Sequence, residues 1–232
     1  MIRKIYILLI LTSVSCRICA QTDEAGKIID KLIKKFQLVN TYSADVVIRP
    51  EISFLKMLPQ KATIYFRQPD KFRIKTTGIT ILPKQQFDNV MNLLSKRDSY
   101  IPLLTSKETI NDIKLSVINV IPVADTSELI LAKIWVDEVR NLIVKAQLTT
   151  KTNGTILINY KHGALAEYGL PDEIIFTVDM KKFKVPKAVA ADINTESKSV
   201  EEQVKQQKPG KIIVTIKNYK LNIDLPDNIF KN

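Results

Sequence analysis

The feature that most constrains the fold is an alternation of apolar and polar residues with a period of two, repeated in many segments from residue 42 onward. Side chains along a β-strand point alternately to opposite faces, so each such segment predicts a strand with one apolar and one polar face. The clearest segments are 42–49, 62–67, 72–76, 142–149, 156–160, 174–180 and 212–216. Two further segments, 113–121 and 129–136, are apolar on both faces. Because short turns join many of these segments, the pattern predicts an antiparallel meander with one solvated face.

Two segments have the helical period instead. Residues 23–40 place a stripe of apolar side chains on one side of a helix: Ile28, Ile29, Leu32, Ile33, Phe36 and Val39. Residues 84–97 follow Pro83, which suits a first helical turn, and carry a second stripe: Phe87, Val90, Met91 and Leu94. A large sheet must cover its apolar face, and such helices can cover it. The sequence therefore predicts a mainly β (α+β) fold, in which a strongly curved antiparallel sheet accepts an N-terminal helix and an inserted helix.

The N-terminus has the composition of a targeting segment. A basic start precedes an apolar run at 5–14, which is too short to span a bilayer, so residues 1–20 predict a secretory signal peptide. Cleavage after Ala20 would leave residues 21–232 as a single domain exported to the periplasm. The alternative is a lipid anchor at Cys16, which is preceded by a partial match to the lipidation signal.

The residue types left after such a cleavage exclude most kinds of catalytic site. Both cysteines precede the cut, and His162 is the single histidine, which argues against a histidine-based metal site, a Ser-His-Asp triad and a Cys-His pair. The six glycines include no clustered pair for a phosphate-binding loop. We interpret the adjacent carboxylates at 137–138, 172–173 and 201–202 as solvated charges, because strand neighbours point to opposite faces. We interpret His162 as a turn residue, and we expect no enzyme, no cofactor and no metal.

Charge is the clearest clue to partners in the composition. The formal net charge is +11, of which three charges lie in the targeting segment and about +8 remain. For an exported protein this charge favours anionic surfaces such as lipid headgroups, and export removes nucleic acid as a partner. Residues 187–209 are rich in Lys, Glu, Gln, Ser and Ala and lack sustained periodicity. They predict a flexible excursion between two strands, with a short helix at 199–206 as an option.

Three stretches resemble one protein family. Residues 65–78, YFRQPDKFRIKTTG, resemble the "strand, Arg-Pro-x-x-Phe, strand" signature of the outer-membrane lipoprotein carrier and receptor proteins, LolA and LolB. Their continuation at 79–94 is similar to a subgroup of LolA-like lipoprotein-sorting proteins. The other two stretches are Trp135-Val136-Asp137 followed by 142–145, and 218–222 followed by Leu225-Pro226-Asp227. The resemblance covers most of residues 23–230.

The resemblance implies an unclosed half-barrel, lidded by helices, whose apolar cavity accepts acyl chains of lipoproteins or lipids without chemistry. The implied partners are those chains and membrane-anchored donor and acceptor proteins, and the implied state is a monomer. Pro69 and Phe72 match the signature. The arginine that holds the lid closed in the carrier is replaced here by Gln68. The arginine stands one residue earlier, at Arg67, where strand alternation turns it to the other face.

Whether the apolar face is a filled core or a cavity wall decides between two functions. Periodicity alone favours a filled core, whereas the wide sheet and the adaptable Phe87 and Met91 favour a cavity under a movable lid. We expect the cavity to be lined by Tyr42, Ile64, Phe66, Phe72 and Ile74, and the lid to consist of Phe87, Val90, Met91 and Leu94. The predicted function is a non-enzymatic periplasmic carrier that shelters acyl chains for transfer to the outer membrane. The alternative is an envelope sensor or scaffold that binds a protein partner with the same fold.

Overall fold

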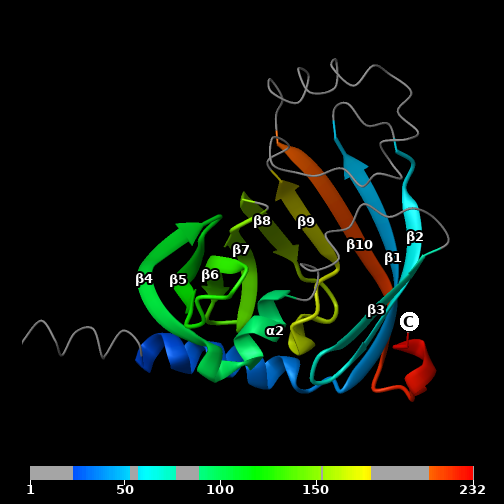
Figure 1. Ribbon diagram of the computed structural model, residues 1–232, viewed down its shortest axis with the longest axis horizontal. Coiled ribbons are helices and arrows are strands. Elements are labelled where there is room, and N and C mark those ends of the chain that lie inside the picture. The colour runs from blue at the N-terminus through cyan, green and yellow to red at the C-terminus, as the bar shows by residue number, and fades with distance from the viewer. Residues whose placement is uncertain (1–22, 53–56, 77–88, 153, 179–208, 232) are drawn as a thin grey trace, which may run out of the picture.

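In the computed structural model, the described residues include ten strands that form one antiparallel sheet (Figure 1). The structure describes residues 23–52, 57–76, 89–152, 154–178 and 209–231. The strands are β1 (Thr41–Glu51), β2 (Gln60–Arg67), β3 (Lys71–Thr76), β4 (Tyr100–Ile110), β5 (Ile113–Pro122), β6 (Leu129–Asp137), β7 (Leu142–Thr150), β8 (Gly154–Lys161), β9 (Glu173–Val178) and β10 (Gly210–Leu221). The predicted signal peptide with Cys16, the helix-starting Pro83, Phe87 and nearly all of the excursion at 187–209 lie outside the described residues.

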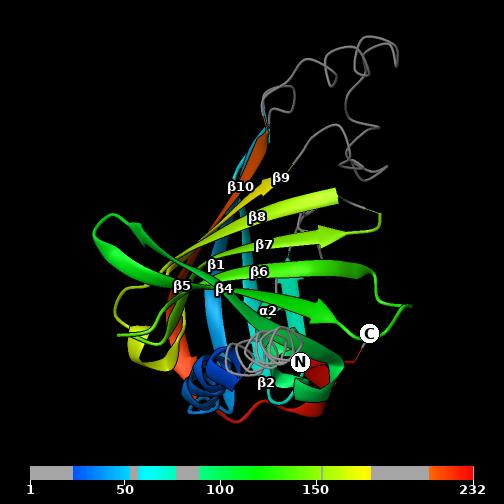
Figure 2. The ribbon, with the colours of Figure 1, turned by 90° about the vertical axis from the view of Figure 1, so that its left-hand side faces the viewer.

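The sheet curls but does not close. Its strand order is β3-β2-β1-β10-β9-β8-β7-β6-β5-β4, so the last strand pairs with both β1 and β9. Strands β3 and β4 are the two edges, and among the described residues no ladder joins them (Figure 2). The prediction of an unclosed, strongly curved antiparallel half-barrel is confirmed.

The hairpin of β2 and β3 has the predicted alternation. Ala62, Ile64 and Phe66 are buried, at 8%, 1% and 1% exposure. Across the ladder, Phe66 lies opposite Phe72 and Ile64 lies opposite Ile74. The apolar side chains of both strands therefore share the concave face of the sheet, as the period of two requires.

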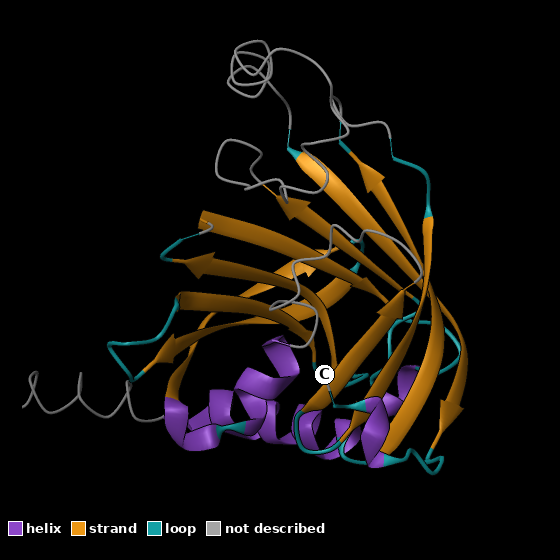
Figure 3. Ribbon diagram, turned by 45° about the vertical axis from the view of Figure 1, so that its right-hand side comes forward, coloured by secondary structure: helices purple, strands orange, loops and turns teal. Residues whose placement is uncertain are grey.

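Helices cover part of the concave side. The N-terminal helix spans residues 23–36 and runs along one end of the curled sheet (Figure 3). Its apolar stripe packs in the core that it shares with the strands, and Ile29 is fully buried. Burying one such side chain contributes roughly 1.5–3 kcal/mol, so the stripe is sufficient to hold the helix. The helix ends before the predicted residue 40, because residues 37 and 38 form a turn. Helix α2 (Asn89–Ser95) lies beside it, and the short helical turns are η1 (Arg97–Ser99), η2 (Ala166–Tyr168) and η3 (Asp227–Ile229).

Strand β4 is the one that the sequence does not predict. Its register with β5 shifts between Leu104 and Ser106, where a bulge places an extra residue in β4. Before the bulge Tyr100 and Leu104 are buried, whereas residues 105–107 beyond it are exposed. A bulge reverses the order of inward and outward residues, so neither half is long enough to show a period of two.

The convex face has a small hydrophobic cluster of its own. Leu115, Val117 and Trp135 are buried there, with exposures of 2%, 0% and 4%. The ammonium groups of Lys133 and Lys145 lie 4.8 and 4.3 Å from the centre of the Trp135 ring, within the range of cation–π attraction. This cluster explains why segments 113–121 and 129–136 are apolar on both faces.

Candidate ligand cavity

A cavity opens on the concave side, between the strands and the two helices. Counted with the open space at its mouth, it has a volume of about 790 Å³. The enclosed part is small, at about 90 Å³, so most of the larger figure is space open to solvent. Most of its lining is apolar or aromatic: Leu32, Phe36, Tyr42, Ile64, Phe72, Val90, Met91, Leu142, Ile143, Leu170, Pro171, Ile174 and Ile216. Such a lining suits an apolar ligand.

The structure places the predicted site residues in two groups. Tyr42, Ile64, Phe72, Val90 and Met91 line the cavity. Phe66, Ile74 and Leu94 are not among the lining residues, although all three pack in the core around it.

Phe66 and Leu94 support the cavity from behind. The Phe66 ring packs between those of Phe36 and Tyr42, with ring centres 5.2 and 5.1 Å apart. The carbonyl of Leu94 accepts a 2.8 Å hydrogen bond from the buried hydroxyl of Tyr100, which ties the last turn of α2 to β4. Phe66 thus holds the wall in place, and Leu94 anchors α2.

Four polar side chains at the cavity were not predicted: Asn141, Tyr160, His162 and Tyr219. Burial raises the pKa of both tyrosines, so both phenols stay protonated at neutral pH. The Tyr219 hydroxyl donates a 2.8 Å hydrogen bond to the Pro171 carbonyl. Tyr160 could have been found from its place in the alternating segment 156–160, but the remaining three depend on how the sheet curls.

The interpretation of His162 as a turn residue is incomplete. The residue does follow the end of β8, but its side chain lines the cavity, with its ring centre 6.3 Å from that of Tyr160. Burial and the positive charges of Arg140 and Lys35 together lower the pKa of His162 to about 4, although a hydrogen bond with the Gly169 backbone opposes this shift. The imidazole is therefore neutral at pH 7.

The turn between β6 and β7 places Asn141 at the cavity, next to Arg140, and Asp137 fixes that turn. The Asp137 carboxylate accepts 3.0 Å bonds from the amides of Val139 and Arg140 and a 2.6 Å bond from the Arg140 guanidinium. Burial alone would raise the pKa of Asp137, but its hydrogen bonds and the charge of Arg140 lower it overall. The interpretation of Asp137 as a solvated charge is wrong, since its side chain is only 4% exposed.

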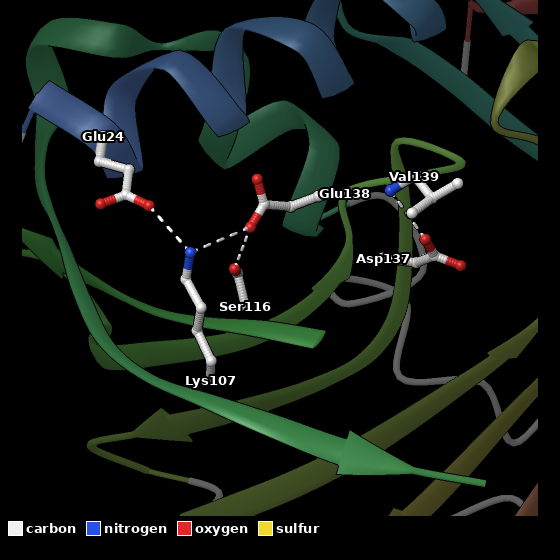
Figure 4. Close-up of polar contacts among 6 residues, drawn as sticks. All are labelled: Glu24, Lys107, Ser116, Asp137, Glu138 and Val139. Atoms are coloured by element: carbon white, nitrogen blue, oxygen red, sulfur yellow. Dashed lines mark hydrogen bonds and ion pairs between the residues drawn. The ribbon is translucent and has the colours of Figure 1, made fainter. Parts of the chain in front are cut away.

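The same turn is tied to the N-terminal helix through a polar network (Figure 4). The ammonium group of Lys107 on β4 lies 3.1 Å from Glu24 of the helix and 3.9 Å from Glu138 of the turn. The buried hydroxyl of Ser116 also donates to Glu138. On the opposite side of the turn, Lys35 of the helix donates to the backbone carbonyl of Arg140. Helix and turn therefore hold each other in place beside the cavity.

Gln68 connects the hairpin turn to the end of the N-terminal helix. Its side-chain amide donates to the backbone carbonyl of Val39 at 2.9 Å and, at 3.5 Å, to that of Phe36. Arg67 points elsewhere, as strand alternation predicts: it lies 2.5 Å from the carboxylate of Asp227 and stacks over Phe230 in the C-terminal tail. The position that departs from the carrier signature thus fixes the end of a covering helix by neutral hydrogen bonds.

Two further classes of site were searched for among the described residues. No group of three or more His, Cys, Asp or Glu side chains in these ranges could hold a metal ion. None of the helices they contain is long and apolar enough to cross a bilayer.

An open half-barrel with helices over an apolar cavity is the architecture of LolA-like proteins, and solved structures agree. The chain is similar to an outer membrane lipoprotein-sorting protein domain from Vibrio parahaemolyticus, with a TM-score of 0.62 and 9% identity over 90% of this chain and 97% of that one. A DUF1329 family protein from Desulfovibrio piger is similar with a TM-score of 0.59 and 9% identity, over 91% of this chain and 97% of that one. A LolA superfamily protein from Nitrosomonas europaea is similar with a TM-score of 0.54 and 15% identity, over 90% of this chain and 97% of that one.

These similarities establish the fold. No protein-family model matches the sequence, and no curated protein matches it. The resemblance seen in the short sequence motifs is therefore borne out by the three-dimensional arrangement of the chain rather than by overall sequence identity.

Proposed function

We propose that this protein is an exported, non-enzymatic carrier that shelters acyl chains of lipoproteins or lipids in its cavity and passes them toward the outer membrane. The observation that carries the proposal is the mostly apolar lining of the cavity on the concave face, bordered by α2 and the N-terminal helix. The fold that the chain shares with a lipoprotein-sorting domain and a LolA superfamily protein supports it.

A carrier that releases its ligand must bind the acyl chain with less than the full free energy of burial, and a helix that is easily displaced from the cavity would achieve this. Burying each methylene of an acyl chain contributes about 0.8 kcal/mol, so a long chain offers on the order of 10 kcal/mol. A carrier must leave part of this free energy unrealised, because a ligand bound with all of it could not be handed on. Helix α2 has only seven residues, and Met91 of this helix is half-buried at the cavity. Displacing such a short helix to admit a chain would cost part of the binding free energy.

Binding of a fluorescent C16 fatty acid to the purified chain tests the proposal. The substitution Phe72→Glu would place a carboxylate in the apolar wall, and we expect it to abolish binding while the circular dichroism spectrum stays that of the wild type. The matched control is Thr63→Glu, which adds the same charge to the neighbouring strand β2 at a position that faces away from the buried Ile64 and lies opposite Asp45 and Lys75.

The outcomes separate clearly. Loss of binding in Phe72→Glu with normal binding in Thr63→Glu supports a cavity-bound chain. No binding by the wild type, together with no acyl species in lipid mass spectrometry after gentle purification, would refute the carrier. Intact mass of the protein from its native envelope reports on the proposed export, since a chain beginning at Gln21 and a chain lipidated at Cys16 differ in mass.

A further inference from the structure

The polar end of the cavity has hydrogen-bonding groups for which the described residues provide no partner. Asn141 and Tyr160 both line the cavity, and neither the Asn141 amide nor the Tyr160 hydroxyl bonds to another described residue. Polar groups that face an otherwise apolar cavity without a partner lose hydrogen bonds unless water or a ligand provides them. Both can donate a hydrogen bond to an oxygen atom. The cavity therefore presents two donors at one end of an apolar lining.

Positive charge acts at the same end. Lys35 of the N-terminal helix reaches the backbone of Arg140, whose neighbour Asn141 lines the cavity. The charges of Lys35 and Arg140 both act on His162 and disfavour its protonation. A field that disfavours a cation at His162 stabilises an anion there. Burial opposes any ion at that position, so an anion also needs direct hydrogen bonds, which Asn141 and Tyr160 can donate.

Acidic groups also lie near this end of the cavity. Asp137 is paired with Arg140, and Asp137 and Glu167 both act on Lys35, but neither is among the charges that act on His162. Asp172 acts on Tyr219, and it also lies at this end of the cavity, because its carboxylate packs against Gly163, the neighbour of His162. The charges that lower the pKa of His162 are nevertheless those of Arg140 and Lys35, so an anion beside the imidazole must bind close to these two cations.

We propose that the cavity takes a single-chain amphiphile with an anionic oxygen headgroup, a carboxylate or a phosphate monoester, bound against Asn141, Tyr160 and His162. This inference rests on the proposed acyl-chain binding and narrows it. A fatty acid or a lysophosphatidate has such a headgroup, whereas an uncharged glyceryl group joined to acyl chains has none. Lys35 and Arg140 stabilise the headgroup by their charge, and the remaining lining holds the chain.

The test compares ligands that share one chain and differ in headgroup. Hexadecanoic acid, hexadecanol and palmitoyl lysophosphatidate are titrated at pH 7.5 against the full chain, by displacement of an uncharged fluorescent probe. Lys35→Met keeps the length of the side chain and removes its charge. The matched control is Lys34→Met, one residue earlier on the same helix, where the side chain is exposed and makes no ion pair with the described residues.

We expect the wild type to prefer the two anionic ligands over hexadecanol. Lys35→Met should weaken their binding by about tenfold, which corresponds to ~1.4 kcal/mol, and change hexadecanol binding less than about twofold. Tyr160→Phe, which removes only the unbonded hydroxyl, should also weaken the anionic ligands selectively. Lys34→Met should leave all three unchanged. A preference for lysophosphatidate over the acid would assign the headgroup to a phosphate, and the reverse to a carboxylate.

Two results overturn the inference in different ways. If all three ligands bind the wild type equally well, the headgroup inference is wrong while acyl-chain binding stands. If none binds, acyl-chain binding fails and the headgroup inference fails with it. His162 gives an independent readout, because a bound anion should raise its pKa while hexadecanol should not. As the single histidine of the chain, it gives one set of imidazole resonances.

Discussion

Protonation of His162 should limit the stability of the fold in mild acid. The imidazole has a pKa of about 4 in the folded protein, because burial and the charges of Arg140 and Lys35 disfavour its charged form. In the unfolded chain its pKa returns to about 6.5. The folded state therefore takes up its proton only at lower pH than the unfolded state. Stability is unaffected above pH 6.5 and falls as the pH drops from there toward 4.

The size of the effect follows from the two pKa values. A difference of about 2.5 in pKa, at ~1.36 kcal/mol for each unit, amounts to about 3 kcal/mol once the pH is well below 4. At pH 5 the unfolded chain is almost fully protonated at this residue and the folded chain almost fully neutral, so the loss is about 2 kcal/mol. Relative to a typical stability of about 5–15 kcal/mol, this is a large fraction.

Urea unfolding of the wild type and His162→Gln, at pH 7.5 and pH 5, measures this term. Glutamine retains a donor for the Gly169 backbone but has no proton to gain. Any structural cost of the substitution is common to both pH values and cancels. We expect the difference in the free energy of unfolding, variant minus wild type, to be about 2 kcal/mol higher at pH 5 than at pH 7.5. A difference between the two proteins that is the same at both pH values would refute the reasoning.

Three further substitutions test the contacts around the cavity. Gln68→Ala removes the side-chain donor at the end of the N-terminal helix. It should lower the free energy of unfolding by about 1 kcal/mol and speed amide hydrogen exchange at residues 37–40. Faster exchange across the whole sheet would contradict a local role. Asp137→Ala should lower the free energy of unfolding by about 2–3 kcal/mol in urea at pH 7, because it leaves the turn amides and Arg140 without their acceptor. A decrease of under about 0.5 kcal/mol would show that the turn keeps its structure without this carboxylate. Tyr100→Phe removes the hydroxyl that donates to the Leu94 carbonyl. It should lower the free energy of unfolding by about 1 kcal/mol and speed amide hydrogen exchange in α2. Unchanged exchange in α2 would show that this hydrogen bond does not anchor the helix.

The strands and the N-terminal helix could be predicted because each is determined by local pattern. Ile64 and Phe66 alternate with polar residues, and the register of β2 with β3 preserves that alternation. The helix stripe that contains Ile29 needs only the period of 3.6. In contrast, β4 was missed because the bulge at Leu104 interrupts its alternation. Local patterning therefore identifies an element only where its geometry stays regular.

The apolar wall of the cavity was more predictable than its polar end. Tyr42, Ile64 and Phe72 lie on alternating segments near the start of the chain, and the hairpin brings them together. His162 and Asn141 lie after and before strands, where no periodicity applies. Their approach depends on the curl of the sheet and on the N-terminal helix. A residue whose role is set by contacts across long sequence separations has no local signal, and the sequence alone therefore could not show it.

The place of β10 in the sheet has a consequence for how the molecule is assembled. Strands β1–β3 on one side and β4–β9 on the other are joined in the sheet only through β10, which emerges last in synthesis. Its pairing with β1 joins residues such as Tyr42 and Leu221, near opposite ends of the domain, and such distant pairing is slow to form. A nascent or truncated chain that ends before residue 210 has two separate partial sheets and no complete cavity. Competence to bind a ligand would then arise in one step, when β10 is inserted between β1 and β9.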